Sequence, residues 1–228
     1  MMRLIFKIMA VLVAAIVLYN LWIFGHIVYW RSHNPSASAF MNEQLAKLQE
    51  DDPEAALRQK WVPYAQISPN LKRALIAAED AKFADHEGFD WDGIEAAFEK
   101  NLKQGRIVAG GSTISQQLAK NLFLSSKKTP WRKLEEAAIT VMLEKVLDKR
   151  RIFEIYLNVI EWGNGVFGAE AAARYYFHTS AARLSAGQAA KLAAMVPNPR
   201  YYDEHRNAPG LMKKTRIIQR RMAFADLP

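Results

Sequence analysis

Residues 110 to 121 of the chain read Gly110-Gly111-Ser112-Thr113-Ile114-Ser115-Gln116-Gln117-Leu118-Ala119-Lys120-Asn121. The last seven positions are typical of the first turns of a helix, with Ser112 or Thr113 as its N-cap. Unpaired backbone N–H groups and the positive end of the helix dipole attract anions to such a terminus. Two glycines allow the backbone to approach a ligand closely, and Lys120 adds a full charge further along. The segment predicts an anion site or, more simply, a capped helix with a polar face.

Upstream, a second polar cluster reads Glu79-Asp80-Ala81-Lys82-Phe83-Ala84-Asp85-His86-Glu87-Gly88-Phe89-Asp90. Ser68-Pro69 predicts the start of a helix, and the helical spacing of the apolar residues that follow carries this helix to the two adjacent carboxylates. Acid–base catalysis needs a carboxylate whose pKa is adjusted by burial and neighbours. The apolar run before Glu79 favours its partial burial. The alternative is a solvated helix end with salt bridges.

Downstream, a third cluster reads Arg132-Lys133-Leu134-Glu135-Glu136 and follows a second helix start at Thr129-Pro130. Arg132 and Glu136 are spaced i, i+4, so they could form a surface ion pair of small worth. A carboxylate beside cationic side chains would also suit a site for a phosphate leaving group. Periodicity does not choose between these two interpretations.

Helical spacing dominates the chain from Trp61 onward, and no run alternates as a strand, so we expect a mainly α domain over residues 61–228. Residues 31–60 form a polar connection with a short helix predicted from Ala39 to Gln49. The remaining helices are expected around the buried stripe Ile139, Met142, Leu143 and Val146, and over residues 150–158, 169–176 and 184–195.

Residues 1–30 are predicted to be a transmembrane anchor. The chain is almost entirely apolar from Ile8 to Trp30, and a bilayer-spanning helix needs about 20 such residues. Aromatic residues cluster toward the end of this run, as in an interfacial belt, whereas a cleaved signal peptide, which is the alternative, has a shorter apolar region. Arg3 and Lys7 favour a cytoplasmic N-terminus, which would place the domain outside the cytoplasmic membrane.

The chain is basic, with 31 Lys and Arg against 23 Asp and Glu and a formal net charge of +8. A basic protein at a bilayer should meet anionic lipids or anionic substrates, while nucleic acid is the competing explanation for the same charge. The sequence has no cysteine, which excludes disulfides and thiolate metal sites.

Taken in order, the three clusters resemble the peptidoglycan glycosyltransferase family in its single-domain, membrane-anchored form, over roughly residues 61–202. The first family motif is matched by Glu79, Asp80, Phe83, His86, Gly88 and Asp90, the second throughout Gly110 to Asn121, and the third by Arg132, Lys133 and Glu136. The continuation of the third motif is Tyr156-Leu157-Asn158. Lys128 departs from the pattern because related enzymes usually carry arginine there, and lysine lacks the bidentate geometry for phosphate.

The resemblance implies a lysozyme-like helical domain with a smaller membrane-proximal lobe, preceded by one transmembrane helix. It implies that the growing glycan strand on undecaprenyl pyrophosphate is transferred to the 4-hydroxyl of lipid II, with inversion to a β-1,4 link. Glu79 would be the general base. Lys120, Arg132 and Lys128 would stabilise the departing pyrophosphate. Glu136, the second expected catalytic residue, would lie on the donor side and orient sugar or cations.

The resemblance also implies substrate-binding residues, namely Asp80, Phe83, His86, Gly111, Ser112, Thr113, Gln117, Lys120, Asn121, Lys128 and Arg132. It implies no metal site and no required cofactor, although stimulation by Mg²⁺ or Mn²⁺ stays open. The expected partners are lipid II, the growing strand, the membrane and cell-wall synthesis or division proteins, without nucleic acid. The expected location is the bacterial inner membrane, with a single pass and the catalytic domain on the periplasmic face.

Two other classes of function remain at this point. Ser115 to Lys120 also reads like the recognition helix of a helix-turn-helix regulator, which would need the domain on the cytoplasmic side. A lysozyme-like glycan hydrolase would use carboxylates as well, but it has no need for a phosphate site around Gly110 to Lys120.

Overall fold

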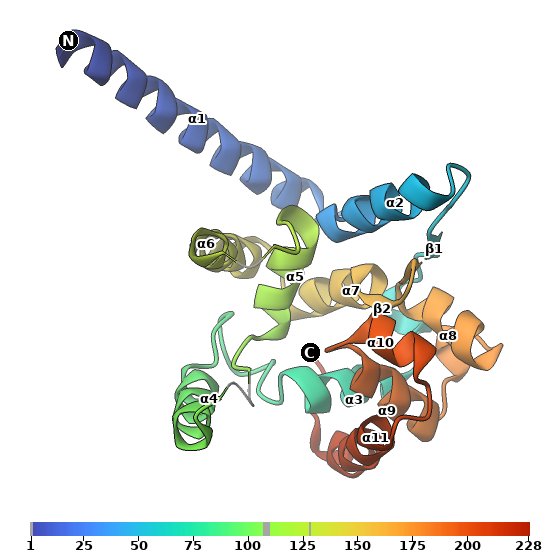
Figure 1. The fold of residues 1–228 in the computed structure, drawn as a ribbon. Helices are drawn as coiled ribbons and strands as arrows, with labels where there is room; N and C mark the ends of the chain where they lie inside the picture. Colours follow the sequence, from blue (N-terminus) through green and yellow to red (C-terminus); the bar gives the residue numbers. More distant parts are fainter. Residues whose placement is uncertain (1, 107–109, 128) are drawn as a thin grey trace.

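The computed structural model describes residues 2–106, 110–127 and 129–228. The fold is mainly α, as predicted, with its helices gathered into one body from which the first helix projects (Figure 1). The α-helices are α1 (Met2–Tyr29), α2 (Ala39–Asp51), α3 (Pro69–Glu79), α4 (Trp91–Gln104), α5 (Ile114–Phe123), α6 (Pro130–Val146), α7 (Lys149–Val159), α8 (Ala169–Phe177), α9 (Ala186–Met195), α10 (Pro199–Glu204) and α11 (Pro209–Arg221).

A small three-stranded sheet, which the sequence did not predict, lies beside these helices. Its strands are β1 (Arg58–Gln59), β2 (Glu161–Gly163) and β3 (Val166–Phe167), in the order β1-β3-β2. The β1 and β3 strands are parallel, whereas β2 and β3 are antiparallel. Strands of two or three residues are too short to show the alternation by which a strand is recognised in a sequence.

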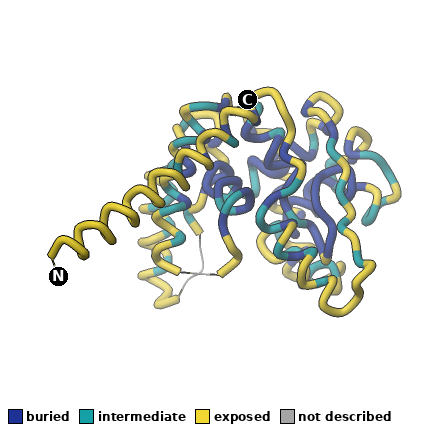
Figure 2. The backbone as a smooth tube through the Cα atoms, turned by 90° about the horizontal axis from the view of Figure 1, so that it is seen from above, coloured by how far each residue is buried: buried dark blue, intermediate teal, exposed yellow. Residues whose placement is uncertain are grey.

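The core is one cluster of buried side chains that draws on two groups of helices. In the first group α9 packs against α3 and α11, and in the second α5 packs against α6 and α7. Figure 2 shows buried backbone concentrated in this body, whereas the projecting helix is exposed along most of its length. Trp162, the largest fully buried side chain, donates its indole N–H to the carbonyl oxygen of Leu192 at 3.1 Å, which ties the sheet to α9.

The projecting helix α1 has 28 residues and is long and apolar enough to cross a membrane. Its C-terminal part belongs to the body, because Ile23 and Ile27 are fully buried and α1 packs against α6. Arg151 of α7 donates hydrogen bonds to the backbone oxygens of Trp30 at 2.8 Å and His33 at 2.6 Å. The end of α1 is therefore fixed to the domain by side-chain packing and by these bonds.

The α2 helix covers the short helix predicted within residues 31–60 and lies against α5. Ser38 caps it by accepting a hydrogen bond from the backbone N–H of Met41. Glu43 accepts hydrogen bonds from the backbone N–H and the hydroxyl of Ser126, at 2.9 and 2.5 Å. This helix therefore holds the segment between α5 and α6 in place.

The helices that carry the three polar clusters begin at the predicted caps. Ser68 accepts from the backbone N–H of Asn70 at 3.2 Å and begins α3, and Thr129 begins α6 in the same way. Thr113, rather than Ser112, caps α5 in a reciprocal capping box with Gln116. Glu79 ends α3, so the chain leaves this helix at the two adjacent carboxylates, as predicted.

Candidate active site

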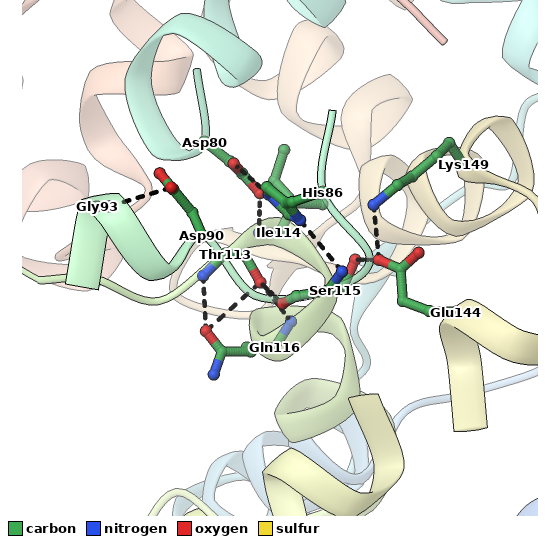
Figure 3. A network of polar contacts seen from close by, with 11 residues as sticks. Asp80, His86, Asp90, Gly93, Thr113, Ile114, Ser115, Gln116, Glu144 and Lys149 are labelled. Carbon is green, nitrogen blue, oxygen red and sulfur yellow. Dashed lines mark hydrogen bonds and ion pairs between the residues drawn. The ribbon is translucent and has the colours of Figure 1, made fainter. Parts of the chain in front are cut away.

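The loop that follows α3 is joined to the start of α5 through Asp80 (Figure 3). One carboxylate oxygen, Oδ2, accepts a hydrogen bond from the backbone N–H of Ile114 at 2.9 Å, and the other, Oδ1, lies 2.9 Å from His86 Nε2. The Asp80 side chain is only 1% exposed. A helix N-terminus favours an anion, and here the chain's own carboxylate occupies that position.

His86 has a defined proton arrangement in this network. Its Nδ1 accepts a hydrogen bond from the backbone N–H of Gly88 at 3.1 Å, so the proton of the neutral ring lies on Nε2 and is donated to Asp80. Gly88 has φ +90, and a Cβ there would come within 2.8 Å of the Thr140 side chain. The loop therefore needs glycine at this position for both its backbone conformation and its space.

A partly buried ion pair braces this region from α6 and α7. Glu144 accepts a hydrogen bond from the hydroxyl of Ser115 at 2.5 Å and pairs with Lys149 at 2.8 Å (Figure 3). The ammonium group of Lys149 also lies 4.6 Å from the ring centre of Phe83. Phe83 is fully buried and packs against Phe153, so its ring supports the loop from the core.

Glu79, in contrast, has one carboxylate oxygen that accepts a hydrogen bond and one that accepts none from the described residues. Oε2 accepts a hydrogen bond from the side-chain amide of Gln117 at 3.0 Å. Oε1 is buried and has no hydrogen-bond partner among the described residues, and the ammonium group of Lys214 on α11 lies 3.8 Å from it. A buried carboxylate oxygen without a donor is costly, so it marks a place where an external donor would be accommodated.

A pocket of about 170 Å³ opens beside Glu79. It lies between the end of α3, the start of α4 and the backbone that leads into α5. Its lining includes Glu79, Asp80, Asp90, Gly93, Gly111, Ser112 and Thr113. The pocket therefore joins the first carboxylate cluster to the glycine- and hydroxyl-rich segment.

A cluster of charged side chains lies at the other side of Ser112. Glu136 is buried and pairs with Arg132 at 3.0 Å and with Lys133. The ammonium group of Lys133 also donates to the hydroxyl of Ser112 at 3.3 Å. Because Glu136 is only 3% exposed, the interpretation of Arg132 and Glu136 as a surface ion pair is wrong.

Lys120 lies within electrostatic reach of both carboxylates. Burial lowers the pKa of Lys120, and the charges of Arg132 and Lys133 lower it further. The carboxylates of Glu136 and Glu79 raise it. A half-buried cation between a possible base and a second carboxylate suits a site where negative charge develops during a reaction.

Sequence comparison assigns the family. The family model described as "Transglycosylase" matches residues 42–223, most of the chain. The chain belongs to the transglycosylase family. A relative from Chromobacterium violaceum named "Biosynthetic peptidoglycan transglycosylase" is 83% identical over 228 residues, with the whole of both chains covered. Relatives with the same name are 70% identical, from Laribacter hongkongensis over the whole of both chains and from Methylobacillus flagellatus over 93% of each. The chain is thus a peptidoglycan glycosyltransferase, and the resemblance seen in its motifs is confirmed.

Most of the residues predicted for the transglycosylase site lie in two neighbouring groups. The first surrounds Glu79 and its pocket and contains Asp80, His86, Gly111, Ser112, Thr113 and Gln117. The second surrounds Glu136 and contains Arg132 and Lys120. Lys133 bridges the two groups through Ser112.

Two predicted residues lie differently, and a third cannot be placed. Phe83 is part of the core, and Asn121 is buried and donates its amide to the backbone oxygen of Gln117 at 2.7 Å within α5. Lys128 lies outside the described residues. Gly111 lines the pocket, but a Cβ there would come within 2.9 Å of the Ile94 backbone, so the close approach of α4 also requires glycine.

Sequence reasoning assigned no site role to Tyr156, Lys214, Lys133, Ser115 or Glu144. Tyr156 and Lys133 were noticed only as motif positions. Nothing in the sequence around Lys214 connects it with Glu79, because only the packing of α11 against α3 brings the two residues together. Among the described residues, no group of three or more His, Asp or Glu side chains could hold a metal ion.

Proposed function

We propose that this transglycosylase polymerises glycan chains from lipid II. The growing strand, carried on undecaprenyl pyrophosphate, is the donor, and the 4-hydroxyl of lipid II is the acceptor. As the acceptor oxygen bonds to the anomeric carbon, its proton passes to Glu79, and the bond from that carbon to the pyrophosphate oxygen breaks with its electron pair. Attack from the face opposite the leaving group inverts the centre and gives a β-1,4 link.

The observation that carries this proposal is the asymmetry of Glu79. A general base must have an oxygen that is free to accept a hydrogen bond from the hydroxyl that it deprotonates. Oε1 of Glu79 is buried, has no hydrogen-bond partner among the described residues and belongs to a residue that lines the pocket. A sugar hydroxyl bound in that pocket would supply the missing donor.

The charged cluster around Glu136 supports a pyrophosphate leaving group. Lys120 and Arg132 would stabilise the negative charge that grows on the phosphate oxygens as the glycosidic bond to phosphate breaks. Glu136, held by Arg132 and Lys133, would keep these cations in position and orient the donor sugar. Lys128 is proposed to assist at the pyrophosphate as well.

The surroundings of the site agree with a substrate that remains in a membrane. The α1 helix could span a bilayer, and Arg3 and Lys7 before its apolar core favour a cytoplasmic N-terminus. We therefore place the catalytic domain on the periplasmic face of the inner membrane, where cell-wall synthesis or division proteins could be partners. Any stimulation by Mg²⁺ or Mn²⁺ would act on the bound pyrophosphate.

The test is polymerisation by the purified full chain in detergent with lipid II as the only sugar substrate, followed by sizing of the glycan. We expect long strands from the wild type and a loss of turnover of about 100-fold or more for Glu79→Gln, in line with general-base contributions. Glu99→Gln is the matched control, because Glu99 is an exposed residue of α4 paired with Lys103. Near-normal polymerisation by Glu79→Gln would refute the assignment of the base, and shortening of added glycan would show a hydrolase instead.

A further inference from the structure

The phenol of Tyr156 lies behind the candidate base. It projects from α7, is fully buried, and packs against Phe153 with 6.2 Å between the ring centres. Its hydroxyl donates a hydrogen bond to Oε1 of Gln117 at 2.9 Å. Burial raises the pKa of Tyr156 well above its usual value, and the nearby carboxylates of Glu79 and Asp80 raise it further. The hydroxyl therefore keeps its proton and remains a donor at any working pH.

This hydrogen bond determines how the amide of Gln117 is turned. The oxygen and nitrogen of a glutamine amide have nearly the same shape, so their partners decide which atom lies where. Because the amide oxygen accepts from Tyr156, the NH₂ group faces Glu79 and donates to Oε2 at 3.0 Å. If the amide were reversed, its oxygen would face the carboxylate of Glu79 and the Tyr156 proton would lose its acceptor.

The two bonds together distinguish the oxygens of Glu79. Oε2 is held by Gln117, whereas Oε1 has no hydrogen-bond partner among the described residues. The charged groups that face the carboxylate are Lys214 on α11, Lys120 on α5 and the adjacent Asp80, with neutral Tyr156 behind. None of these groups is a hydrogen-bond donor to Oε1, so this oxygen is left for a ligand.

We propose that Tyr156, acting through Gln117, fixes the carboxylate of Glu79 so that Oε1 is the atom that receives the acceptor proton. Tyr156 and Gln117 are then positioning residues for the base. This goes beyond the sugar- or phosphate-binding role expected for Gln117, and it rests on the proposed function for the reaction itself.

The test compares Tyr156→Phe with the wild type in the full chain, using lipid II polymerisation measured across a range of pH. The substitution keeps the buried ring and removes only the hydroxyl. We expect kcat to fall about 10-fold or more with KM within about twofold, because a hydrogen bond to a charged group is lost or misdirected. The acid limb of the pH–rate profile should move to higher pH, since the charged form of the base loses its donor.

A double-mutant cycle shows whether the hydroxyl acts through the amide. Gln117→Leu should reproduce the shift of the acid limb, and adding Tyr156→Phe to it should cause almost no further loss, because residues in one network are not additive. Tyr176→Phe is the matched control: its hydroxyl donates to the Trp162 backbone oxygen at 2.7 Å, away from the site, so kcat and the acid limb should not change.

Two results would overturn the proposal that Tyr156 positions Glu79 through Gln117. One is a wild-type pH–rate profile for Tyr156→Phe, or for Gln117→Leu if the tyrosine variant does not fold. The other is full additivity in the cycle. If Tyr156 and Gln117 do not position Glu79 but the proposed function holds, Glu79→Gln is still inactive. If the proposed function itself is wrong, Glu79→Gln retains activity.

Discussion

Removing the Asp80 carboxylate should destabilise the domain, because this side chain satisfies the first backbone N–H of α5. In Asp80→Ala, the N–H of Ile114 would lose its acceptor at a fully buried residue. A hydrogen bond to a charged group is worth about 1.5–3 kcal/mol. The favourable interaction of an anion with the helix N-terminus adds about 0.3–1 kcal/mol. The expected loss in free energy of unfolding is therefore about 2–4 kcal/mol.

Thermal unfolding of the full chain in detergent, followed by circular dichroism, measures this loss. For a domain of this size, about 2–4 °C is lost per kcal/mol, so Tm should fall by roughly 5–15 °C. Asp80→Asn is the matched control, since its amide oxygen can still accept from Ile114, while the charge and the hydrogen bond from His86 Nε2 are lost. We expect a decrease about half as large or smaller for Asp80→Asn.

Hydrogen exchange gives a local readout, because the amide of Ile114 should exchange faster in Asp80→Ala than in Asp80→Asn. The reasoning would be refuted if Asp80→Ala changed Tm by less than about 2 °C. It would also be refuted if the alanine and asparagine variants unfolded at the same temperature, since the loss would then not come from the missing acceptor.

Three further predictions follow from burial, charge and packing. Lys120→Met should abolish most polymerisation, while Tm stays equal or rises near neutral pH. Burial lowers the pKa of Lys120, so its charged form costs stability below the lowered pKa, and this cost is relieved as pH rises toward the usual 10.5. Lys120→Arg should recover part of kcat, and an effect of Lys120→Ala on KM alone would contradict a role at the leaving group. Hydrogen bonds from Lys47 and Ser126 are the largest causes that lower the pKa of Glu43 from 4.5 to about 2. The stability that Glu43 contributes is therefore present above pH 4.5 and is lost as the pH falls toward about 2. The slope of Tm against pH in this window should become shallower in Glu43→Gln, and an unchanged slope would show that the contact contributes nothing. Deleting residues 1–20 should leave the Tm of the domain almost unchanged. Deletion through Trp30 also removes the buried Ile23 and Ile27 and should lower Tm by several degrees, because each buried isoleucine contributes about 1.5–3 kcal/mol. Equal Tm values for the two truncations would show that this packing does not stabilise the domain.

Local chemistry made the helix starts and the clustering of carboxylates predictable. Ser68, Thr113 and Thr129 are capping residues whose role is decided within three or four positions of the chain. The end of α3 at Glu79 was predictable from the helical spacing of the apolar residues before it. The family motifs then linked these local features to a reaction.

Long-range contacts account for what could not be predicted. The sequence indicated an anion at the start of α5 but could not show that Asp80 fills this position. The burial of Glu136, the approach of Lys214 to Glu79 and the direction of the Tyr156 hydrogen bond all depend on how separate helices pack. The small sheet was missed because its strands are too short to leave a pattern.

With α1 in the membrane, as proposed above, the joint between α1 and the domain has a consequence for neighbouring membrane proteins. Ile23 and Ile27 pack into the body, and Arg151 binds the backbone oxygens that follow the helix. These contacts should therefore pass a rotation of α1 about its own axis on to the domain. A second membrane helix that docks on the exposed face of α1 would thus determine the direction, within the plane of the membrane, in which the pocket beside Glu79 opens. It would thereby also determine the direction in which a new strand leaves the enzyme.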